Sequence, residues 1–320
     1  MEDLISVLVP VYNARVWLQN CLDSIASQTW GNWEAVLVDD GSSDGSAEIC
    51  DAMAAGDPRF RVLHQRNMGV SAARNAALDA AAGKYVYFID ADDCMHPRAL
   101  ELLHSAICSG PYRMASGEFS WADSDVRSAD GPLPEAVRTV ISSREGFMSC
   151  LERASRFVWL VVWNKLIDKS LLENIRFDDI AQEDVLFMAR IYMETDMFVH
   201  LDVSLYSYLR GTHGLSEDKE YMGLLSELIV KTYMYRYASG NPGYQGLILR
   251  KTYKRFLVCR YRARNREEAE HVTATLRPFI REHWKDFFAS RAIPLADKLQ
   301  CPVFYACPWL MRLVLKLYGN

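Results

Sequence analysis

Runs of apolar residues alternate with amphipathic stretches through the first 110 residues of the chain. We expect helices near 15–28, 44–53 and 69–82, and a further helix that begins at Pro97 and ends near Cys108. Continuous apolar strands separated by helices are typical of a parallel sheet that helices cover on both faces, and ligands of such sheets bind beyond the carboxyl ends of the strands. The sequence therefore predicts an α/β fold. Its predicted strands are Ile5–Val11, Trp33–Val38, Phe60–His64 and Tyr85–Ile89.

The alternation weakens after residue 110. Asp, Ser, Gly and Pro residues between Met114 and about Arg138 predict loops and a hairpin. Helical patterns return at 143–154 and 184–194, and residues 197–209 predict two short strands. Beyond about Tyr221 the pattern is helical, so we expect one domain over residues 1–220 and a helical C-terminal region over residues 221–320.

Charge divides the chain at the same place. Residues 1–220 carry 19 Lys and Arg against 34 Asp and Glu, whereas residues 221–320 carry 17 against 7. The acidic part would repel nucleic acid, so we expect no nucleic-acid partner. The basic part suits an anionic membrane surface, and it is also a candidate contact for a homo-oligomer.

The chain contains no pattern of an exported or membrane-spanning protein. Its N-terminus is acidic and leads directly into the first strand, and the longest apolar run, Pro302–Met311, is too short for a span and precedes Arg312. We therefore expect a cytoplasmic protein that is peripheral on the inner face of the membrane. The eight cysteines contain no C-x-x-C pair, which predicts reduced, mostly buried thiols rather than a zinc ribbon or a thioredoxin-like site.

Four polar clusters lie at strand ends or in loops of this pattern. Taken singly, each has a structural interpretation, because Asp-Gly is common in turns, paired Asp residues shape loops, and acidic residues suit the first turn of a helix. Taken together, in this order and on these elements, they indicate one site. The clusters are Pro10–Asn13, Asp39–Asp44, Asp90–Asp93 and Gln182–Asp184.

These clusters give the chain a family resemblance. Residues 4–110 resemble an inverting family 2 glycosyltransferase of the kind that builds bacterial cell-surface polysaccharides. The resemblance implies a GT-A fold over residues 1–220, with a mostly parallel sheet flanked by helices, and transfer of a hexosyl-type sugar from a nucleoside diphosphate to an acceptor hydroxyl. It does not name the sugar, and the C-terminal hundred residues lie outside it. The matching segments are Val7–Asn13, Val38–Asp44, Asn67–Asn75 and Phe88–Asp93, and Trp163–Lys165 with Glu183–Phe187 extend the match to about residue 190.

The leaving diphosphate explains one acidic cluster. It carries at least two negative charges, which a divalent cation held by carboxylates neutralises. Asp90 and Asp92 resemble the D-x-D motif of the family, which implies that Asp92 ligates Mn²⁺ or Mg²⁺ and that Asp90 lies nearer the ribose or a water of the metal. Which of Asp90, Asp92 and Asp93 touches the metal stays open.

The nucleobase and the reacting hydroxyl need further groups. The uracil N–H of a UDP-sugar requires an acceptor, and Asp39 matches the family position that reads the base, with Pro10 and Tyr12 lining the pocket. The acceptor hydroxyl must lose its proton as it attacks, and a carboxylate is the usual base. Asp184 matches the base position of the family, and Glu183 is expected to orient a sugar or acceptor hydroxyl.

Three residues have two interpretations each, and a fourth has one. Arg74 either pairs with Asp residues or phosphate, or is a solvated charge on an Ala-rich helix. Trp163 either stacks on a sugar or packs in the core. His213 is either a third metal ligand, as late-chain histidines are in GT-A enzymes, or a loop residue without a role, and Arg210 is a candidate to bind the diphosphate.

Rival functions lack their motifs. No glycine-rich loop follows the first strand, which argues against a sugar-1-phosphate nucleotidyltransferase or a dinucleotide-dependent dehydrogenase, and no Walker A sequence exists. A catalytically inactive transferase that binds carbohydrate or serves as a membrane scaffold remains the alternative from another class. The expected partners are a nucleotide-sugar donor and a glycan or lipid-linked acceptor.

Overall fold

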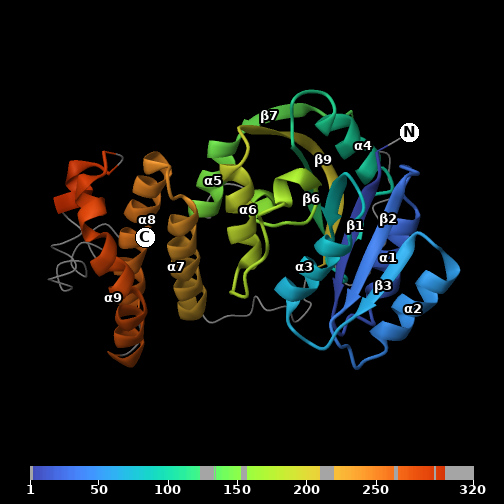
Figure 1. Cartoon of the computed structure of the whole chain (residues 1–320), viewed down its shortest axis with the longest axis horizontal. Helices are drawn as coiled ribbons and strands as arrows, with labels where there is room; N and C mark the ends of the chain where they lie inside the picture. The colour runs from blue at the N-terminus through green and yellow to red at the C-terminus, as the bar shows by residue number, and fades with distance from the viewer. Residues whose placement is uncertain are drawn as a thin grey trace. The chain divides into compact units, whose positions relative to one another are not determined.

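The computed structural model describes residues 3–122, 133, 135–152, 157–209, 220–262, 266–291 and 293–299. The chain forms two compact units (Figure 1). Unit 1 comprises residues 1–179 and 183–214, and unit 2 comprises residues 180–182 and 215–320.

Nine strands of the described residues form one mixed sheet in unit 1, in the order β3-β2-β1-β4-β8-β6-β9-β5, with β7 paired to β9. The strands β3, β2, β1 and β4 run parallel to one another, whereas β8 runs antiparallel to both β4 and β6. The strands are β1 (Ile5–Val11), β2 (Trp33–Asp39), β3 (Phe60–His64), β4 (Tyr85–Phe88), β5 (Cys94–Met95), β6 (Met114–Ala122), β7 (Arg138–Ser142), β8 (Lys165–Asp168) and β9 (Met197–Leu209).

Helices connect and cover these strands. α3 packs on β1 and β2, and α4 packs on β6, β8 and β9. Every residue of β1 is buried, which is why this central strand is a continuous apolar run. The helices of unit 1 are α1 (Leu18–Ala26), α2 (Ser46–Gly56), α3 (Val70–Ala80), α4 (Ala99–Ile107), α5 (Ser143–Glu152) and α6 (Glu183–Met193), with the 3₁₀ helices η1 (Phe157–Trp159) and η2 (Lys169–Leu172).

The predicted α/β class with a mostly parallel sheet and a helical C-terminal region is confirmed. The start of α4 differs from the prediction, because Pro97 lies in the turn before it. The amide of Ala99 donates to the carbonyl of His96 at 2.8 Å, and this turn delays the helix to Ala99. Of the cysteines described, Cys21, Cys50, Cys94 and Cys150 are buried and Cys108 is exposed.

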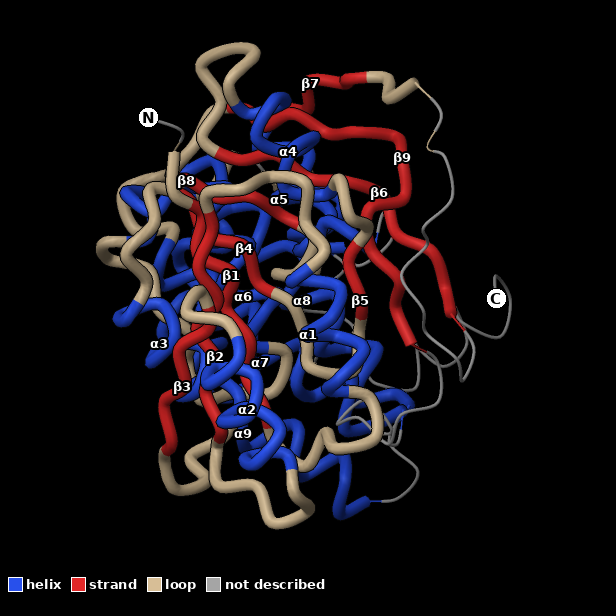
Figure 2. The backbone as a smooth tube through the Cα atoms, turned by 90° about the vertical axis from the view of Figure 1, so that its right-hand side faces the viewer, coloured by secondary structure: helices blue, strands red, loops and turns tan. Residues whose placement is uncertain are grey.

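The prediction of loops and a hairpin between Met114 and about Arg138 is wrong in part. Residues 114–122 form β6, and β7 pairs with β9 rather than with β6 (Figure 2). The polar residues that suggested a loop find partners across the sheet, because Ser116 Oγ lies 2.8 Å from Nδ1 of His200 and Glu118 Oε1 lies 2.9 Å from its Nε2.

The two short strands predicted for residues 197–209 are one strand, β9, of 13 residues. The polar residue Asp202 lies where the register between β6 and β9 shifts. A bulge of this kind absorbs extra residues and leaves the strand continuous.

Unit 2 is helical in its described part, with α7 (Glu220–Tyr237), α8 (Pro242–Arg262) and α9 (Arg266–Ala289) side by side (Figure 1). Its interior holds an ion-pair network in which Glu227 contacts Lys231 and Arg255, each at 2.5 Å. Asp297 likewise pairs with Arg250 at 2.5 Å and Lys254 at 2.7 Å. None of the described helices is long and apolar enough to cross a membrane.

Candidate active site

The carboxyl ends of β1, β2 and β4 gather the first three polar clusters at one edge of the sheet. Val11 at the end of β1 is in register with Asp39 at the end of β2, and β4, which also neighbours β1, ends two residues before Asp90. Parallel strands end at the same edge, so sequence positions 11, 39 and 90 converge there.

Arg74 of α3 joins this edge to the fourth cluster. Its Nη2 donates to Asp90 Oδ1 at 2.9 Å, and its Nη1 donates to Glu183 Oε1 at 2.6 Å. The side chain is 7% exposed, so the interpretation as a solvated charge is wrong. Burial opposes the charge on the guanidinium, but Asp90, Glu183 and Asp184 outweigh it and raise the pKa of Arg74 above its ordinary value.

α3 also positions the chain that leads into α6. Ser71 Oγ donates to the carbonyl of Asp178 at 2.8 Å. Asn75 makes a two-way contact with Phe177, donating to its carbonyl and accepting from its amide, each at 2.9 Å. The Ser, Arg and Asn of the segment Asn67–Asn75 therefore place the N-terminus of α6 beside Asp90.

Asp184 lies in the first turn of α6, next to Glu183. Burial and the neighbouring charge of Glu183 raise the pKa of Asp184 to about 7, against the opposing influence of Arg74. A carboxylate with a pKa near neutrality is suited to accept a proton at physiological pH. Its Oδ1 accepts a hydrogen bond from the amide of Val185 at 2.8 Å.

The three acidic residues after β4 have different surroundings. Asp93 is 1% exposed, and its carboxyl accepts hydrogen bonds from the Tyr206 hydroxyl at 2.6 Å and the Leu209 amide at 2.8 Å. Burial, with Asp92 and Asp90 nearby, raises the pKa of Asp93 well above its ordinary value. Asp93 is therefore built into the fold, whereas Asp90 and Asp92 are only partly buried.

Asp90 and Asp92 fit a divalent cation by their chemistry. Mg²⁺ in nucleotide sites is typically held by one or two carboxylates together with substrate phosphates. Among the described residues, no third Asp, Glu, His or Cys side chain completes a group with these two carboxylates in which all ligand atoms lie within 4.8 Å of one another. The remaining ligands would then come from the diphosphate, from water or from a residue outside the described part of the chain.

Asp39 is held at the end of β2 by neighbours on either side. Its Oδ1 accepts from the amide of Ser42 at 3.1 Å, and its Oδ2 lies 3.1 Å from Nδ1 of His64. Burial alone would raise the pKa of Asp39, but the hydrogen bonds from Ser42 and His64 outweigh it and keep the pKa below its usual value. Of its expected companions, Pro10 is buried in β1 and Tyr12 is 53% exposed.

Asp40 has a structural role in the loop that leads into α3. It accepts from the amides of Met68 and Gly69, both at 2.8 Å, and from the side chain of Gln65 at 2.7 Å. These bonds fix the loop that leads into α3. Gly41, with a φ of +75°, passes so close that a Cβ there would lie 2.8 Å from the amide nitrogen of Asn67.

Trp163–Lys165 is a packing motif. Trp163 is 3% exposed and stacks on Tyr206 with ring centroids 4.4 Å apart, which favours the core interpretation over sugar stacking. The buried Lys165 Nζ donates to the carbonyls of Val158, Val161 and Trp163 at 2.5 to 3.2 Å. Burial lowers the pKa of Lys165 to about 7.

Sequence reasoning missed His64 and the aromatic residues of β9. His64 bridges Asp39 and Asp51, and its register with Asp39 would have signalled it once the order of β2 and β3 was known. No sequence signal marks Tyr206 and Tyr208. Burial raises the pKa of Tyr208 to about 12, and the charges of Asp93, Asp90, Asp92 and Asp184 add to the shift. Arg210 and His213, expected to bind diphosphate and metal, lie outside the described residues.

Comparison with known sequences gives a family match. The model of glycosyl transferase family 2 matches residues 6–178. The glycosyltransferase GlyA of Streptococcus pneumoniae is 36% identical over 214 residues, which are 65% of this chain and 31% of GlyA. The uncharacterized glycosyltransferase EpsJ of Bacillus subtilis is 32% identical over 75% of this chain and 71% of its own length. The chain therefore spans about a third of GlyA and over two thirds of EpsJ.

Solved structures support the fold. Residues 1–349 of S. aureus TarS, in complex with UDP-GlcNAc, superpose with a TM-score of 0.63 at 18% identity, covering 94% of this chain and 91% of that one. The mannosyltransferase PcManGT from Pyrobaculum calidifontis, in complex with GDP-Man and Mn²⁺, gives a TM-score of 0.52 at 14% identity, covering 96% and 88%. At these identities the likeness confirms the fold that the sequence resemblance implies.

Proposed function

This chain belongs to glycosyl transferase family 2, and we propose that it is an inverting enzyme that transfers a sugar from a UDP-sugar to an acceptor hydroxyl with the help of a divalent metal. The family match establishes that the chain is a glycosyltransferase that uses a nucleotide-sugar donor. The observation that carries the finer proposal is the pair of hydrogen bonds from Arg74. One goes to Glu183, the neighbour of Asp184 in the chain, and the other goes to Asp90. Together they join the proposed base to the proposed metal carboxylates.

Asp184 acts as the base in this proposal. The acceptor hydroxyl transfers its proton to the carboxylate while its oxygen forms the new bond to the anomeric carbon, and the bond from that carbon to the diphosphate oxygen breaks on the opposite face. One displacement inverts the anomeric configuration and needs no carboxylate nucleophile, unlike a retaining glycosidase. The pKa of about 7 supports this role, since the group is substantially ionised at neutral pH and still basic enough to accept the proton.

The metal would be held by Asp90 and Asp92. When bound, Mn²⁺ or Mg²⁺ neutralises charge that develops on the leaving diphosphate. Arg74 limits what Asp90 contributes, because it already takes Asp90 Oδ1. Asp92 is therefore the direct ligand in this proposal and Asp90 the supporting one. Arg210 and His213 remain candidates for the diphosphate and the metal, and PcManGT, solved with Mn²⁺, is consistent with a metal here.

Asp39 would read the nucleobase. Its carboxylate is ionised and held rigidly by Ser42 and His64, so it offers an acceptor to the N–H of uracil. The exposed ring of Tyr12 and the buried Pro10 flank this point at the end of β1. TarS was solved with UDP and with UDP-GlcNAc, which favours a uridine donor over the GDP-Man of PcManGT.

The acceptor in this proposal is a glycan or a lipid-linked glycan. EpsJ and GlyA, the similar proteins named above, are bacterial glycosyltransferases, and residues 221–320 carry a surplus of ten positive charges. Such a surplus attracts an anionic membrane, where lipid-linked acceptors reside. We therefore assign catalysis to residues 1–220 and place residues 221–320 at the inner face of the membrane, or in a contact between subunits.

The test measures donor binding and turnover separately. A thermal-shift series with UDP-, GDP-, CMP- and dTDP-sugars, each with and without Mn²⁺, should give the largest stabilisation with a UDP-sugar and Mn²⁺. Release of UDP from that donor should then depend on an acceptor saccharide and on the metal. Donor binding without any release of nucleoside diphosphate across an acceptor panel would favour the inactive carbohydrate-binding alternative.

A further inference from the structure

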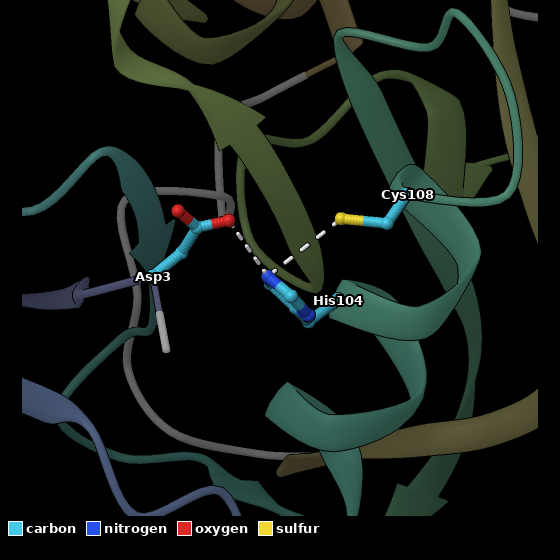
Figure 3. A group of neighbouring side chains, drawn as sticks. All are labelled: Asp3, His104 and Cys108. Atoms are coloured by element: carbon cyan, nitrogen blue, oxygen red, sulfur yellow. Dashed lines mark hydrogen bonds and ion pairs between the residues drawn. The ribbon is translucent and has the colours of Figure 1, made fainter. Parts of the chain in front are cut away.

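Asp3, His104 and Cys108 form a second group of metal-ligating side chains, away from the active site (Figure 3). Asp3 precedes β1 by two residues, so it lies at the amino end of the parallel strands, the edge opposite to the carboxyl ends that carry Asp39 and Asp90. His104 and Cys108 are four residues apart at the end of α4, which puts them on one face of the helix. Their ligand atoms all lie within 4.8 Å of one another.

The distances in this group match a metal polyhedron. Zn–N and Zn–O bonds of about 2.0 to 2.2 Å and a Zn–S bond of about 2.3 Å place tetrahedral N and O ligands about 3.4 Å apart, and N and S ligands about 3.6 Å apart. His104 Nε2 lies 3.2 Å from Asp3 Oδ2 and 3.7 Å from Cys108 Sγ. One ion can therefore bind all three with only small side-chain movements.

The surroundings hold the histidine and favour a cation. The His104 ring packs against Trp30, with centroids 4.1 Å apart, and edge-on against Tyr85 at 5.5 Å, so its orientation is fixed without metal. His104 and Cys108 both lie at the C-terminal end of α4, where the helix dipole places partial negative charge. Cys108 is the exposed cysteine among those described, so ions reach it from solvent.

Lys84 is the group that opposes a cation. Its Nζ lies 3.2 Å from Oδ1 and 3.1 Å from Oδ2 of Asp3. The lysine side chain is 54% exposed and can turn to Oδ1 or to water, which leaves Oδ2, the oxygen that faces His104, for a metal. Lys84 would thus weaken metal binding without blocking it.

We propose that Asp3, His104 and Cys108 bind one zinc ion, with water in the fourth position. Thiolate and imidazole together select zinc over Mg²⁺ or Mn²⁺, so the group is distinct in metal preference from the carboxylates of the active site. On binding, the Cys108 thiol loses its proton to solvent and the Zn–S bond forms. The ion would link the start of β1 to the end of α4, about a hundred residues later in the chain.

The first experiment uses Co²⁺, whose thiolate complexes absorb in the near ultraviolet. Metal-free full-length protein titrated with Co²⁺ should develop a thiolate-to-cobalt band that saturates at one equivalent and that Zn²⁺ abolishes. Cys108→Ser should lose this band and bind Zn²⁺ at least tenfold more weakly by calorimetry. Lys84→Ala should bind more tightly than the wild type. Asp92→Asn, which alters the other acidic site, and Cys50→Ser, which alters a buried thiol outside the group, should keep the band.

A second measurement needs no variant. Zn²⁺ should slow alkylation of Cys108 by N-ethylmaleimide, followed by mass spectrometry of the peptide that contains it, whereas Mg²⁺ at the same concentration should not. Absence of a thiolate band in the wild type, the same band in a folded Cys108→Ser protein, or equal alkylation of Cys108 with and without Zn²⁺ would each overturn the proposal.

Discussion

At the scale of single residues, neighbouring acidic side chains of one type take different roles. Asp39 and Asp40 are adjacent, yet the Asp40 carboxylate accepts hydrogen bonds from the loop 65–69, whereas the Asp39 carboxylate contacts Ser42 and His64. Asp92 and Asp93 divide in the same way, because Asp93 is enclosed by Tyr206 and Leu209. The sequence predicted the clusters, and the backbone geometry sets the hydrogen-bond partners of each carboxylate.

Asp184→Asn tests the base directly. The amide cannot accept the proton, so we expect kcat to fall by about 10²–10⁴-fold while the Kd for the donor stays within about twofold. Turnover and donor binding should be measured on the same preparation, with Asp79→Asn on the surface of α3 as the matched control. Parallel loss of donor affinity would assign Asp184 to the donor site or to the fold instead.

The raised pKa of Asp184 predicts a pH dependence of activity and stability. Activity should rise about tenfold per pH unit below the pKa near 7 and level off above it, as the carboxylate ionises. For stability the sign is opposite. Between the ordinary pKa of 3.8 and about 7 the folded protein retains a proton that the unfolded chain has lost, so this group makes the protein less stable as pH rises through that range.

The same variant checks that sign. Asp184→Asn removes the ionisation, so its melting temperature relative to wild type should be higher at pH 8 than at pH 5, with a difference of roughly 2–3 kcal/mol in unfolding free energy. Melting curves of the two proteins across pH 5 to 8 provide the measurement. A difference between them that does not change with pH would show that Asp184 is not held in the protonated form.

Asp92→Asn tests the metal. Because a neutral amide holds a divalent cation more weakly than a carboxylate, we expect turnover to fall at least 10²-fold and the Mn²⁺ concentration for half-maximal activity to rise. Metal titrations of the initial rate separate these two effects. Near-normal turnover of this variant with Mn²⁺ or Mg²⁺ supplied would remove Asp92 from the metal site.

At the scale of elements, the early strands and helices follow from periodicity, whereas β6 and β9 do not. The strands β1, β2 and β4 are almost entirely buried, whereas β3 is partly exposed, and the sequence predicts the bounds of all four within one residue. β6 carries Ser116 and Glu118, whose polarity is satisfied by His200 on β9, a residue more than 80 positions away. A local sequence pattern cannot predict such a distant partner. For this reason the polar residues of β6 lead to the prediction of a loop, although β6 lies within the sheet.

α3 is the element that assembles the site, and Asn75→Ala tests this. The change leaves the amide and carbonyl of Phe177 without their partner, which should lower the unfolding free energy by about 1–3 kcal/mol. Because residues 177–178 lead toward Glu183, kcat should fall more than donor affinity. Urea unfolding and steady-state kinetics measure the two effects.

Asp79→Ala on the same helix is the control for Asn75→Ala. Asp79 pairs with Arg176 in an exposed contact, and such pairs contribute little. Its unfolding free energy and kcat should both stay close to wild type. Equal effects of the two variants would mean that the Asn75 contact has no special part in placing α6.

At the scale of the whole molecule, the two parts of the chain differ in net charge even though several cations of the basic part are paired with acidic residues. The described cations Arg250, Lys254 and Arg255 pair with Asp297 and Glu227, and the aromatic rings of Tyr253 and Phe256 are buried. These residues therefore support the packing of α7, α8 and α9, and insertion of those two rings into a membrane is not part of the proposal. Attraction of an anionic surface rests on the net charge of residues 221–320.

Membrane binding is tested with charge reversals in the basic part of the chain. Full-length protein should sediment with liposomes containing anionic lipid at low salt, and less so as salt screens the charges, but not with neutral liposomes. Arg260→Glu with Arg262→Glu should reduce binding by roughly tenfold or more, since each cation near such a surface contributes about 1 kcal/mol. Arg66→Glu with Arg144→Glu makes the same change of net charge on exposed residues of the acidic part, and should have a smaller effect. Equal recovery with neutral and anionic liposomes at every salt concentration would leave residues 221–320 with a role in packing or subunit contact alone.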